Sequence, residues 1–189
     1  MSYEIVVVDI TKGRPQLAGK AFGDHVFEEV VAPAAASRRS NSVLVLSLRG
    51  AEFVTGSFLK AIWLRLHPDN DTAVPAVVAH LGDDVRTEFD IFLRGHRLLG
   101  VEALDWTESA ISRARCHGQI EDAAWSALRA LVARPGSTAP ELCATSAEQV
   151  SPTAWTNRLN ELHHQGLVLR ERAGRAWRFF PIAQEVERG

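Results

Sequence analysis

The segment 42–48, SVLVLSL, restricts the fold of this chain more than any other feature of its sequence. It is a continuous apolar run of strand length, without the alternation of apolar and polar residues that a half-exposed strand has. A strand of this kind is typically buried on both faces, as in a sheet that helices cover. The segment therefore predicts a buried strand in an α/β sheet.

Strand-like and helical segments alternate over residues 1–117. A β-branched run at 4–10 predicts the first strand, and Asp24 stands as the N-cap of a short helix that Pro33 ends or kinks. The elements expected beyond 42–48 are a helix at 57–66, a strand at 73–81, a helix at 83–96, a strand at 101–106 and a helix at 107–117. This βαβ series predicts a largely parallel sheet, to which the first strand could add an antiparallel edge.

The pattern changes to helices and a hairpin in residues 118–189. A helix beginning near Ile120 stops at RPG (134–136), TAPE (138–141) is a capping box for a second helix, and SP (151–152) starts a third. The segments LVLRER and RAWRFFPI then predict a β-hairpin with a short turn. With a length of 189 residues, of which 46% are hydrophobic, two small domains are expected, at 1–117 and 118–189.

Three helices followed by a hairpin resemble the winged helix-turn-helix of small bacterial transcription regulators. The phrase WTNRLNELHHQGLVLRERAGRAWRFFPI is similar to the recognition helix and wing of that superfamily, and the match covers about residues 120–182. The resemblance implies a module that docks on double-stranded DNA. Winged helices usually act as dimers on paired half-sites, so a homodimer is expected.

The third helix divides into two faces by its spacing. Trp155, Leu159 and Leu162 fall on one side and should face the core. Short polar side chains on the opposite side suit a major groove, because Asn can bond adenine bidentately and Thr can reach phosphate or a thymine methyl. Arginines on the hairpin suit phosphate or minor-groove contact. The predicted DNA-binding residues are Thr153, Thr156, Asn157, Arg158, Asn160, His164, Arg170, Arg172, Arg175 and Arg178.

Charge gives a mixed signal about this role. From residue 119 onward eight basic residues balance eight acidic ones, whereas phosphate binding favours a positive surplus. The segment 167–178 is locally basic, with four Arg against one Glu. The alternative is that the polar helix face and the charged hairpin are merely solvated, or that a winged helix here makes protein contacts.

The stretch SVLVLSLRGAEFVTGSFLKAIWLRL resembles the STAS-like fold, the family around anti-sigma-factor antagonists, and GDHVFEEVV and VVAHLGDDVRTEFDIF also fit. The resemblance spans about residues 4–106 and implies that Ser57 occupies the regulatory Ser/Thr position, with Thr55 as its neighbour. The chain departs from the pattern where Ser47-Leu48-Arg49 replaces a common Asp and where Phe58-Leu59-Lys60 replaces small or acidic residues. The alternative is that Ser57 simply N-caps the following helix.

Several function classes do not fit the sequence. A formal net charge of −2 excludes a strongly basic nucleic-acid coat protein. No apolar run approaches the ~20 residues of a membrane span, and the start MSYE lacks the positive charge of a signal peptide, so a cytoplasmic protein is expected. Cys116 and Cys143 have no metal-ligand spacing. Phosphate-binding Gly-rich loops, GxSxG and HExxH are all absent, so we expect no enzyme activity, cofactor or metal.

These observations predict a DNA-binding transcriptional regulator with two parts. The STAS-like α/β domain at 1–117 is expected to bind a protein partner or to mediate dimerisation, and the winged helix-turn-helix domain at 118–189 to read DNA. The alternative is an adaptor without DNA binding, of an anti-sigma or defence-circuit type, in which both parts hold proteins.

Overall fold

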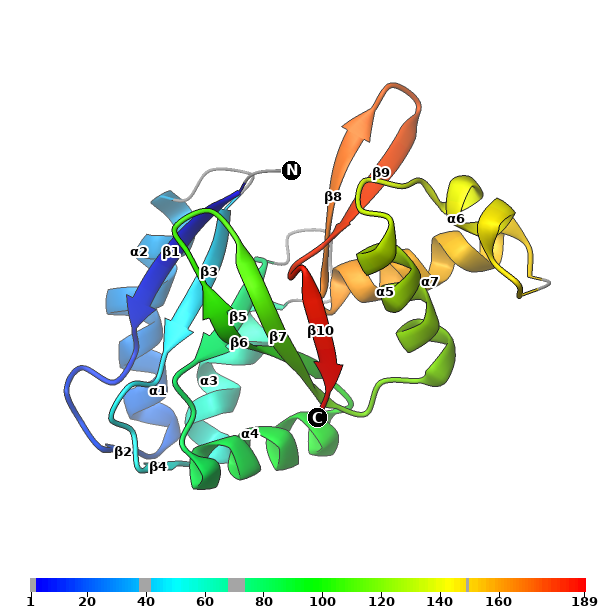
Figure 1. The fold of residues 1–189 in the computed structure, drawn as a ribbon. Coiled ribbons are helices and arrows are strands. Elements are labelled where there is room, and N and C mark those ends of the chain that lie inside the picture. The colour runs from blue at the N-terminus through cyan, green and yellow to red at the C-terminus, as the bar shows by residue number, and fades with distance from the viewer. Residues whose placement is uncertain (1–2, 38–41, 68–73, 149) are drawn as a thin grey trace.

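The computed structural model describes residues 3–37, 42–67, 74–148 and 150–189, and it is a mixed α/β fold around a six-stranded sheet (Figure 1). The strands run in the order β1 (Glu4–Asp9), β3 (Ser42–Ser47), β5 (Ala76–Ala79), β6 (Leu99–Trp106), β7 (Ile111–Gly118) and β10 (Glu185–Arg188). The first four strands are mutually parallel, β7 is antiparallel to β6, and β10 is parallel to β7. The largely parallel sheet predicted from the alternating pattern is therefore confirmed.

One face of the sheet is covered by the helices that connect its parallel strands. These are α1 (Lys20–Val26), the π-helical turn η1 (Phe27–Val31), α2 (Ala32–Ser37), α3 (Gly56–Leu66) and α4 (Asp83–His96), beside a small ladder of β2 (Gln16–Leu17) and β4 (Phe53–Val54). Leu44 and Leu46 of β3 pack on this side with Phe58, Trp63 and Phe89. The helix expected at 83–96 matches α4 in both bounds.

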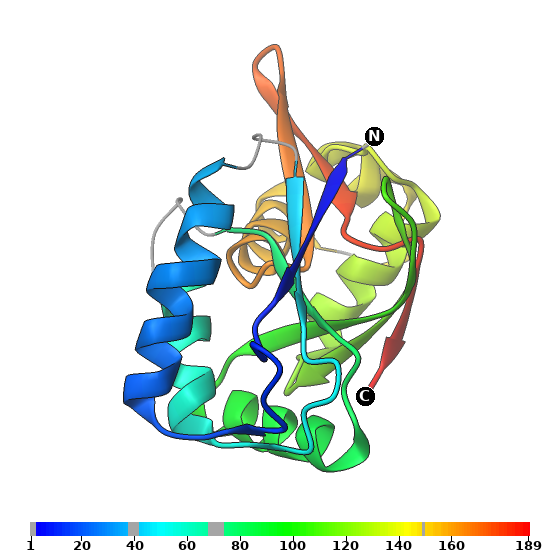
Figure 2. The ribbon, with the colours of Figure 1, turned by 90° about the vertical axis from the view of Figure 1, so that its left-hand side faces the viewer.

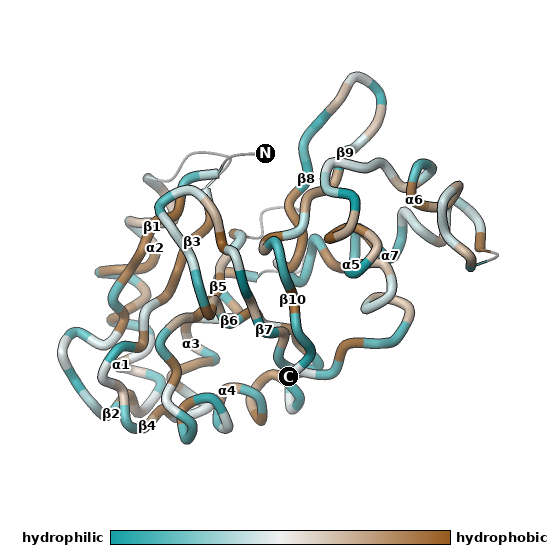
Figure 3. Tube along the Cα trace, viewed as in Figure 1, coloured by the Kyte–Doolittle hydropathy of each residue, from teal (hydrophilic) through white to brown (hydrophobic). Residues whose placement is uncertain are grey.

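The other face is covered by the C-terminal part of the chain (Figure 2). It comprises α5 (Asp122–Ala133), α6 (Ala139–Thr145), α7 (Pro152–His164) and the hairpin of β8 (Val168–Ala173) and β9 (Ala176–Pro181). Val43 and Val45 share one core with Leu128, Trp155 and Phe179. Every residue of β3 is buried, as its apolar run predicts, and Figure 3 shows β3 in brown.

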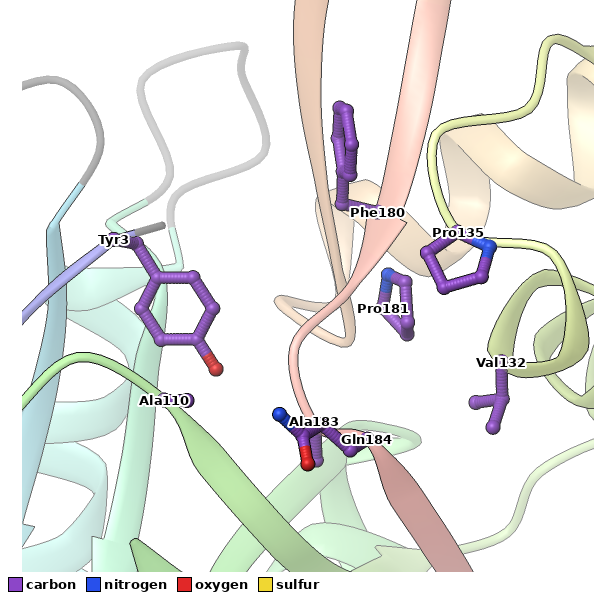
Figure 4. Close-up of a pocket in the computed structure, with 8 residues that line it drawn as sticks. All are labelled: Tyr3, Ala110, Val132, Pro135, Phe180, Pro181, Ala183 and Gln184. Carbon is purple, nitrogen blue, oxygen red and sulfur yellow. The ribbon is translucent and has the colours of Figure 1, made fainter. Parts of the chain in front are cut away.

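The two parts of the chain are joined by specific contacts. The Tyr3 hydroxyl, at the start of the chain, donates to the carbonyl of Ile182 and accepts from the N–H of Ile111 at 3.0 Å. The side-chain oxygen of Gln165 accepts from the N–H of Leu99 at 3.1 Å. Figure 4 shows a pocket of about 240 Å³ at this junction, lined by Tyr3, Ala110, Val132, Pro135, Phe180, Pro181, Ala183 and Gln184. The C-terminal part therefore packs on the sheet and adds a strand to it.

The prediction of a helix at 107–117 is wrong. The N–H of Thr107 donates to the carbonyl of Ala110 at 2.8 Å, which closes a turn, and β7 follows. Ala114 and Cys116 are buried while Arg113 is exposed, so the side chains alternate between the two faces as they do in a strand. Pairing with β6 stabilises β7, and a contact of this kind is invisible to local helix signals.

Three smaller predictions in the N-terminal part also need correction. The edge strand β1 is parallel to β3, not antiparallel. Asp24 is not an N-cap, because α1 begins at Lys20 and Asp24 pairs with Lys20 inside it. Pro33 does not end the helix, as one of its two expected outcomes had it, because α2 runs through Pro33 to Ser37; the π-helical turn η1 lies just before it. Ala73, at the start of the strand predicted for 73–81, lies outside the described residues.

Candidate functional site

The helix α7 begins where its local signals predict. The Ser151 side chain accepts from the N–H of Ala154 at 3.2 Å, and Pro152 occupies the first turn. In the preceding α6, Thr138 and Glu141 form the predicted capping box. Trp155, Leu159 and Leu162 are fully buried, as expected for the inner face of α7. This packing fixes the rotation of α7 and turns its polar side chains outward.

The outer face of α7 carries most of the residues predicted from its spacing. Thr153, Asn157 and His164 are exposed, and Thr156 and Asn160 are half-buried. The Thr156 hydroxyl donates to the carbonyl of Pro152 at 2.9 Å, so its proton is used within the helix. The Asn157 side chain makes no hydrogen bond within the part of the chain that the structure describes, and both its amide donor and its carbonyl acceptor are available there.

Arg158 lies away from this face. Its guanidinium pairs with the Glu148 carboxylate at 2.5 Å and stands 5.7 Å from the centre of the Trp155 ring. Hydrogen bonds from Ser126 and Arg158 lower the pKa of Glu148. Arg158 therefore ties α7 to the segment before it, and its charge is used inside the protein.

The arginines of the hairpin lie on two faces. Residues that pair across antiparallel strands share a face, so the pairing partner of each arginine shows on which face it lies. Arg172 pairs with Trp177, and Arg170 pairs with Phe179 on the same side. Arg178 pairs with Glu171 on the other side and donates to the carbonyl of Gly136 at 2.8 Å. The exposed Arg175 lies in the turn, beside Gly174, whose φ of 63° favours glycine. The hairpin extends beyond the rest of the molecule (Figure 1).

A contact between Arg170 and Asn160 joins the hairpin to α7. The Arg170 guanidinium donates to the side-chain oxygen of Asn160 at 3.3 Å. The outer face of α7 and the face of the hairpin that carries Arg170 and Arg172 therefore form one continuous surface. We call the exposed and half-buried residues of this surface the helix–hairpin face: Thr153, Asn157, Asn160, His164, Arg170, Arg172 and Trp177.

Trp177 belongs to this face, and the sequence interpretation missed it. Its indole is 36% exposed, and the guanidinium carbons of Arg170 and Arg172 lie 4.4 and 5.0 Å from the ring centre. The sequence held a signal, because alternate positions of the two strands carry Arg, Arg and Trp on one face. That signal becomes visible only once the strand register is known.

At the start of α3, the N-cap is Thr55, so the alternative in which Ser57 caps the helix is wrong. The Thr55 hydroxyl oxygen accepts from the N–H of Phe58 at 3.3 Å and from the N–H of Gly19 at 3.1 Å. The Ser57 hydroxyl lies 3.0 Å from that of Thr55 and is exposed. Thr55 therefore joins two segments, whereas Ser57 faces solvent.

A serine and a histidine meet at the ends of β3 and β5, but their bonding does not favour nucleophilic chemistry. The Ser47 hydroxyl lies 3.0 Å from Nδ1 of His80, and the Arg49 guanidinium lies 2.8 Å from Nε2. Burial, and then the charge of Arg49, lower the pKa of His80. A guanidinium only donates, so Nε2 accepts and Nδ1 donates to Ser47. An activated serine needs the opposite arrangement.

Neither cysteine belongs to a group of potential metal ligands among the described residues. Burial raises the pKa of the Cys116 thiol to about 12, which disfavours the thiolate. No three His, Cys, Asp or Glu side chains gather to hold a metal ion within the described residues. Over the same residues, none of the helices has the length and apolar character needed to cross a membrane.

The helix–hairpin face is therefore a surface with groups suited to recognition. It combines amide, hydroxyl and guanidinium groups on a rigid, capped helix and a projecting hairpin. No family model matches the chain, and neither the curated proteins nor the solved structures searched contain a significant match.

Proposed function

We propose that this protein is a DNA-binding transcriptional regulator in which α5, α6, α7 and the hairpin form a winged helix-turn-helix. In this proposal α7 is the recognition helix and the β8–β9 hairpin is the wing. The observation that carries the proposal is the continuous helix–hairpin face, in which the Arg170–Asn160 contact sets the arginines of the hairpin beside the polar face of α7. Its ligand is double-stranded DNA.

The contacts within this face suggest different roles for its two asparagines. The side-chain oxygen of Asn160 is already held by Arg170, so Asn160 orients the wing relative to the helix. Asn157 keeps both its donor and its acceptor available, and adenine recognition in the major groove needs both. We therefore assign base readout to Asn157, and backbone contact to Arg172 and Arg175.

The balanced charge of residues 119–189 is compatible with this role, because the charges are unevenly distributed and the acidic residues Glu141 and Glu148 lie outside the wing with partners of their own. Glu148 pairs with Arg158, and Glu141 accepts from the N–H of Thr138 at 2.7 Å in the capping box. Arg172 and Arg175 form no ion pair with an acidic residue in the described part of the chain. The positive charges of Arg172 and Arg175 on the wing therefore remain available to phosphates.

The N-terminal part, which we propose to be STAS-like, supplies a protein contact or a dimer interface in this scheme. Phe53 is 47% exposed on β4, two residues before Thr55, so an apolar side chain stands in solvent beside the Thr55–Ser57 turn. The same observation favours the second candidate function, a protein-binding adaptor without DNA binding. The two functions differ in whether the helix–hairpin face binds a duplex.

Selection of duplexes from a random library tests the proposal. We expect the unsubstituted protein to enrich a defined motif and to bind it with a strong salt dependence. Asn157→Ala should relax one position of that motif, because a good bidentate base contact discriminates by ~1–3 kcal/mol. Arg129→Ala, on the exposed side of α5, is the control that should leave the motif unchanged. Failure to retain any duplex at low salt would favour the adaptor.

A further inference from the structure

We propose that Trp177 is a nucleic-acid contact residue of the wing and that it acts as one unit with Arg170 and Arg172. The inference rests on the proposed DNA-binding function and extends it to a residue that sequence reasoning did not select. The unit is defined by the two guanidinium carbons, at 4.4 and 5.0 Å from the indole centre. Its expected contact is the sugar–phosphate wall of a groove.

The strand register places this unit where the wing leaves the core. Phe179, two residues along β9 on the same face, is 2% exposed and belongs to the core shared with α7. Trp177 is the next aromatic residue outward and is 36% exposed. Core packing therefore accounts for Phe179, whereas part of the Trp177 indole remains in contact with solvent. Trp177 lies on the face of the hairpin from which Arg170 contacts Asn160.

The stack also prepares the two arginines for binding. A guanidinium held on an aromatic face has fewer rotamers to lose when it meets an acceptor. Arg172 uses its Nε for the carbonyl of Gly174, at 3.3 Å, and has further N–H groups to donate. Trp177 is thus expected to hold the two arginines in a geometry suited to binding.

The chemistry of the unit fits a nucleic acid. It presents an exposed indole with two guanidinium groups close to it, and a nucleotide backbone presents an apolar sugar between two phosphates. Guanidinium groups match phosphate oxygens bidentately, and an indole covers a sugar or a base at low conformational cost. The acidic Glu171 points from the opposite face of the hairpin and does not interrupt the unit.

The test compares Trp177→Ala with Trp177→Phe on a duplex selected by the unsubstituted protein. Loss of two exposed cation–π contacts should weaken binding about tenfold in Trp177→Ala and flatten its salt dependence, although no charge is removed. Trp177→Phe keeps an aromatic face and should bind within about threefold of the parent. Trp125→Phe is the matched control, because Trp125 meets Arg188 at 5.9 Å outside the helix–hairpin face. Circular dichroism establishes that each variant is folded.

Tryptophan emission supplies a readout that a purely structural role would not change. Duplex binding should alter the emission of the parent and of Trp125→Phe to the same extent, and the alteration should be clearly smaller in Trp177→Phe even though that variant still binds. Unchanged affinity and salt dependence in Trp177→Ala would overturn the inference about Trp177 and leave the proposed DNA-binding function intact. An emission change of the same size in Trp177→Phe as in the parent would also overturn it. If the parent binds no duplex, the proposed function fails and the inference fails with it.

Discussion

Thr55 and Ser57 lie two residues apart at the start of α3 and make different contacts. Thr55 accepts from two backbone N–H groups, of Phe58 and Gly19, whereas Ser57 is exposed. We expect Thr55→Ala to lower the free energy of unfolding by ~1–2 kcal/mol, the range for a lost cap. Ser57→Ala should change it by less than ~0.5 kcal/mol, as exposed substitutions do. Urea unfolding of both variants makes the comparison, and equal losses would contradict the assignment of the cap to Thr55.

The regulatory role that the STAS-like resemblance implies for Ser57 has a separate test. A phosphate there would add about −1.5 to −2 charges beside the start of α3. If this turn is a contact surface, Ser57→Glu should weaken self-association or partner binding, while Ser57→Ala should leave it intact. Analytical ultracentrifugation of both variants measures the effect. Identical association of Ser57→Glu and the parent would remove Ser57 from the regulatory scheme.

His67 makes the stability of the protein depend on pH. It is buried, its Nδ1 lies 3.2 Å from the carbonyl of Trp63, and its Nε2 has no hydrogen-bond partner among the described residues. Burial lowers the pKa of His67 to about 4. The unfolded chain binds a proton near pH 6.5 and the folded protein does not, so stability is full above pH 6.5 and falls as the pH drops toward 4.

The loss of stability between pH 7 and pH 5 should be about 2 kcal/mol from this residue. His67→Asn keeps a side-chain donor for the carbonyl of Trp63 and cannot titrate, so its stability should fall less over the same range. Urea unfolding of parent and variant at both pH values gives the difference between the two slopes. If parent and variant lose the same free energy of unfolding between pH 7 and pH 5, groups other than His67 account for the acid sensitivity.

At the scale of elements, the sequence predicted the structures that depend on local chemistry. The bounds of α4, the capping box of α6 and the N-cap of α7 follow from residues within one helical turn. What could not be predicted depends on distant partners. β7 pairs with β6, and no strand was expected at 185–188, where β10 joins β7. The polar face of α7 was predictable from its residue spacing. The place of Trp177 beside the hairpin arginines and the ion pair of Arg158 with Glu148 could be identified only from the tertiary structure.

The wing as an element carries a prediction about salt. Arg172 and Arg175 are exposed near the turn of the hairpin and are assigned to phosphate contacts. Replacing both by Ala should weaken binding to all duplexes and reduce the log–log salt slope by about 0.9 for each lost phosphate contact. Fluorescence anisotropy over a range of salt concentrations measures the slope. A slope equal to that of the parent, with circular dichroism unchanged, would exclude the wing from the interface.

At the scale of the whole molecule, the two parts expected from the sequence share the hydrophobic core on one face of the sheet, while the core on the other face belongs to the N-terminal part. Tyr3→Phe tests this connection, because it leaves the carbonyl of Ile182 and the N–H of Ile111 without the hydroxyl that joins them. Buried groups that lose a partner cost ~1–3 kcal/mol each, so we expect a loss of that order in the free energy of unfolding. Unfolding should remain a single transition, with far-ultraviolet circular dichroism and tryptophan emission coincident. A separate early transition of the C-terminal helices would show that the parts are independent.

The hydrogen bond between Tyr3 and Ile182 joins residues 179 positions apart, and this has a consequence for the rate of folding. Closing so long a loop costs entropy before any contact compensates for it, and β10 pairs with β7 across an intervening segment that holds α5, α6, α7 and the hairpin. Chains dominated by such distant pairings fold in about milliseconds to seconds, whereas helical bundles fold in about microseconds to milliseconds. Until β10 pairs with β7, the unpaired edge of β7 can pair with strands of other chains. This intermolecular pairing leads to aggregation, so the yield of refolded protein should fall as its concentration rises.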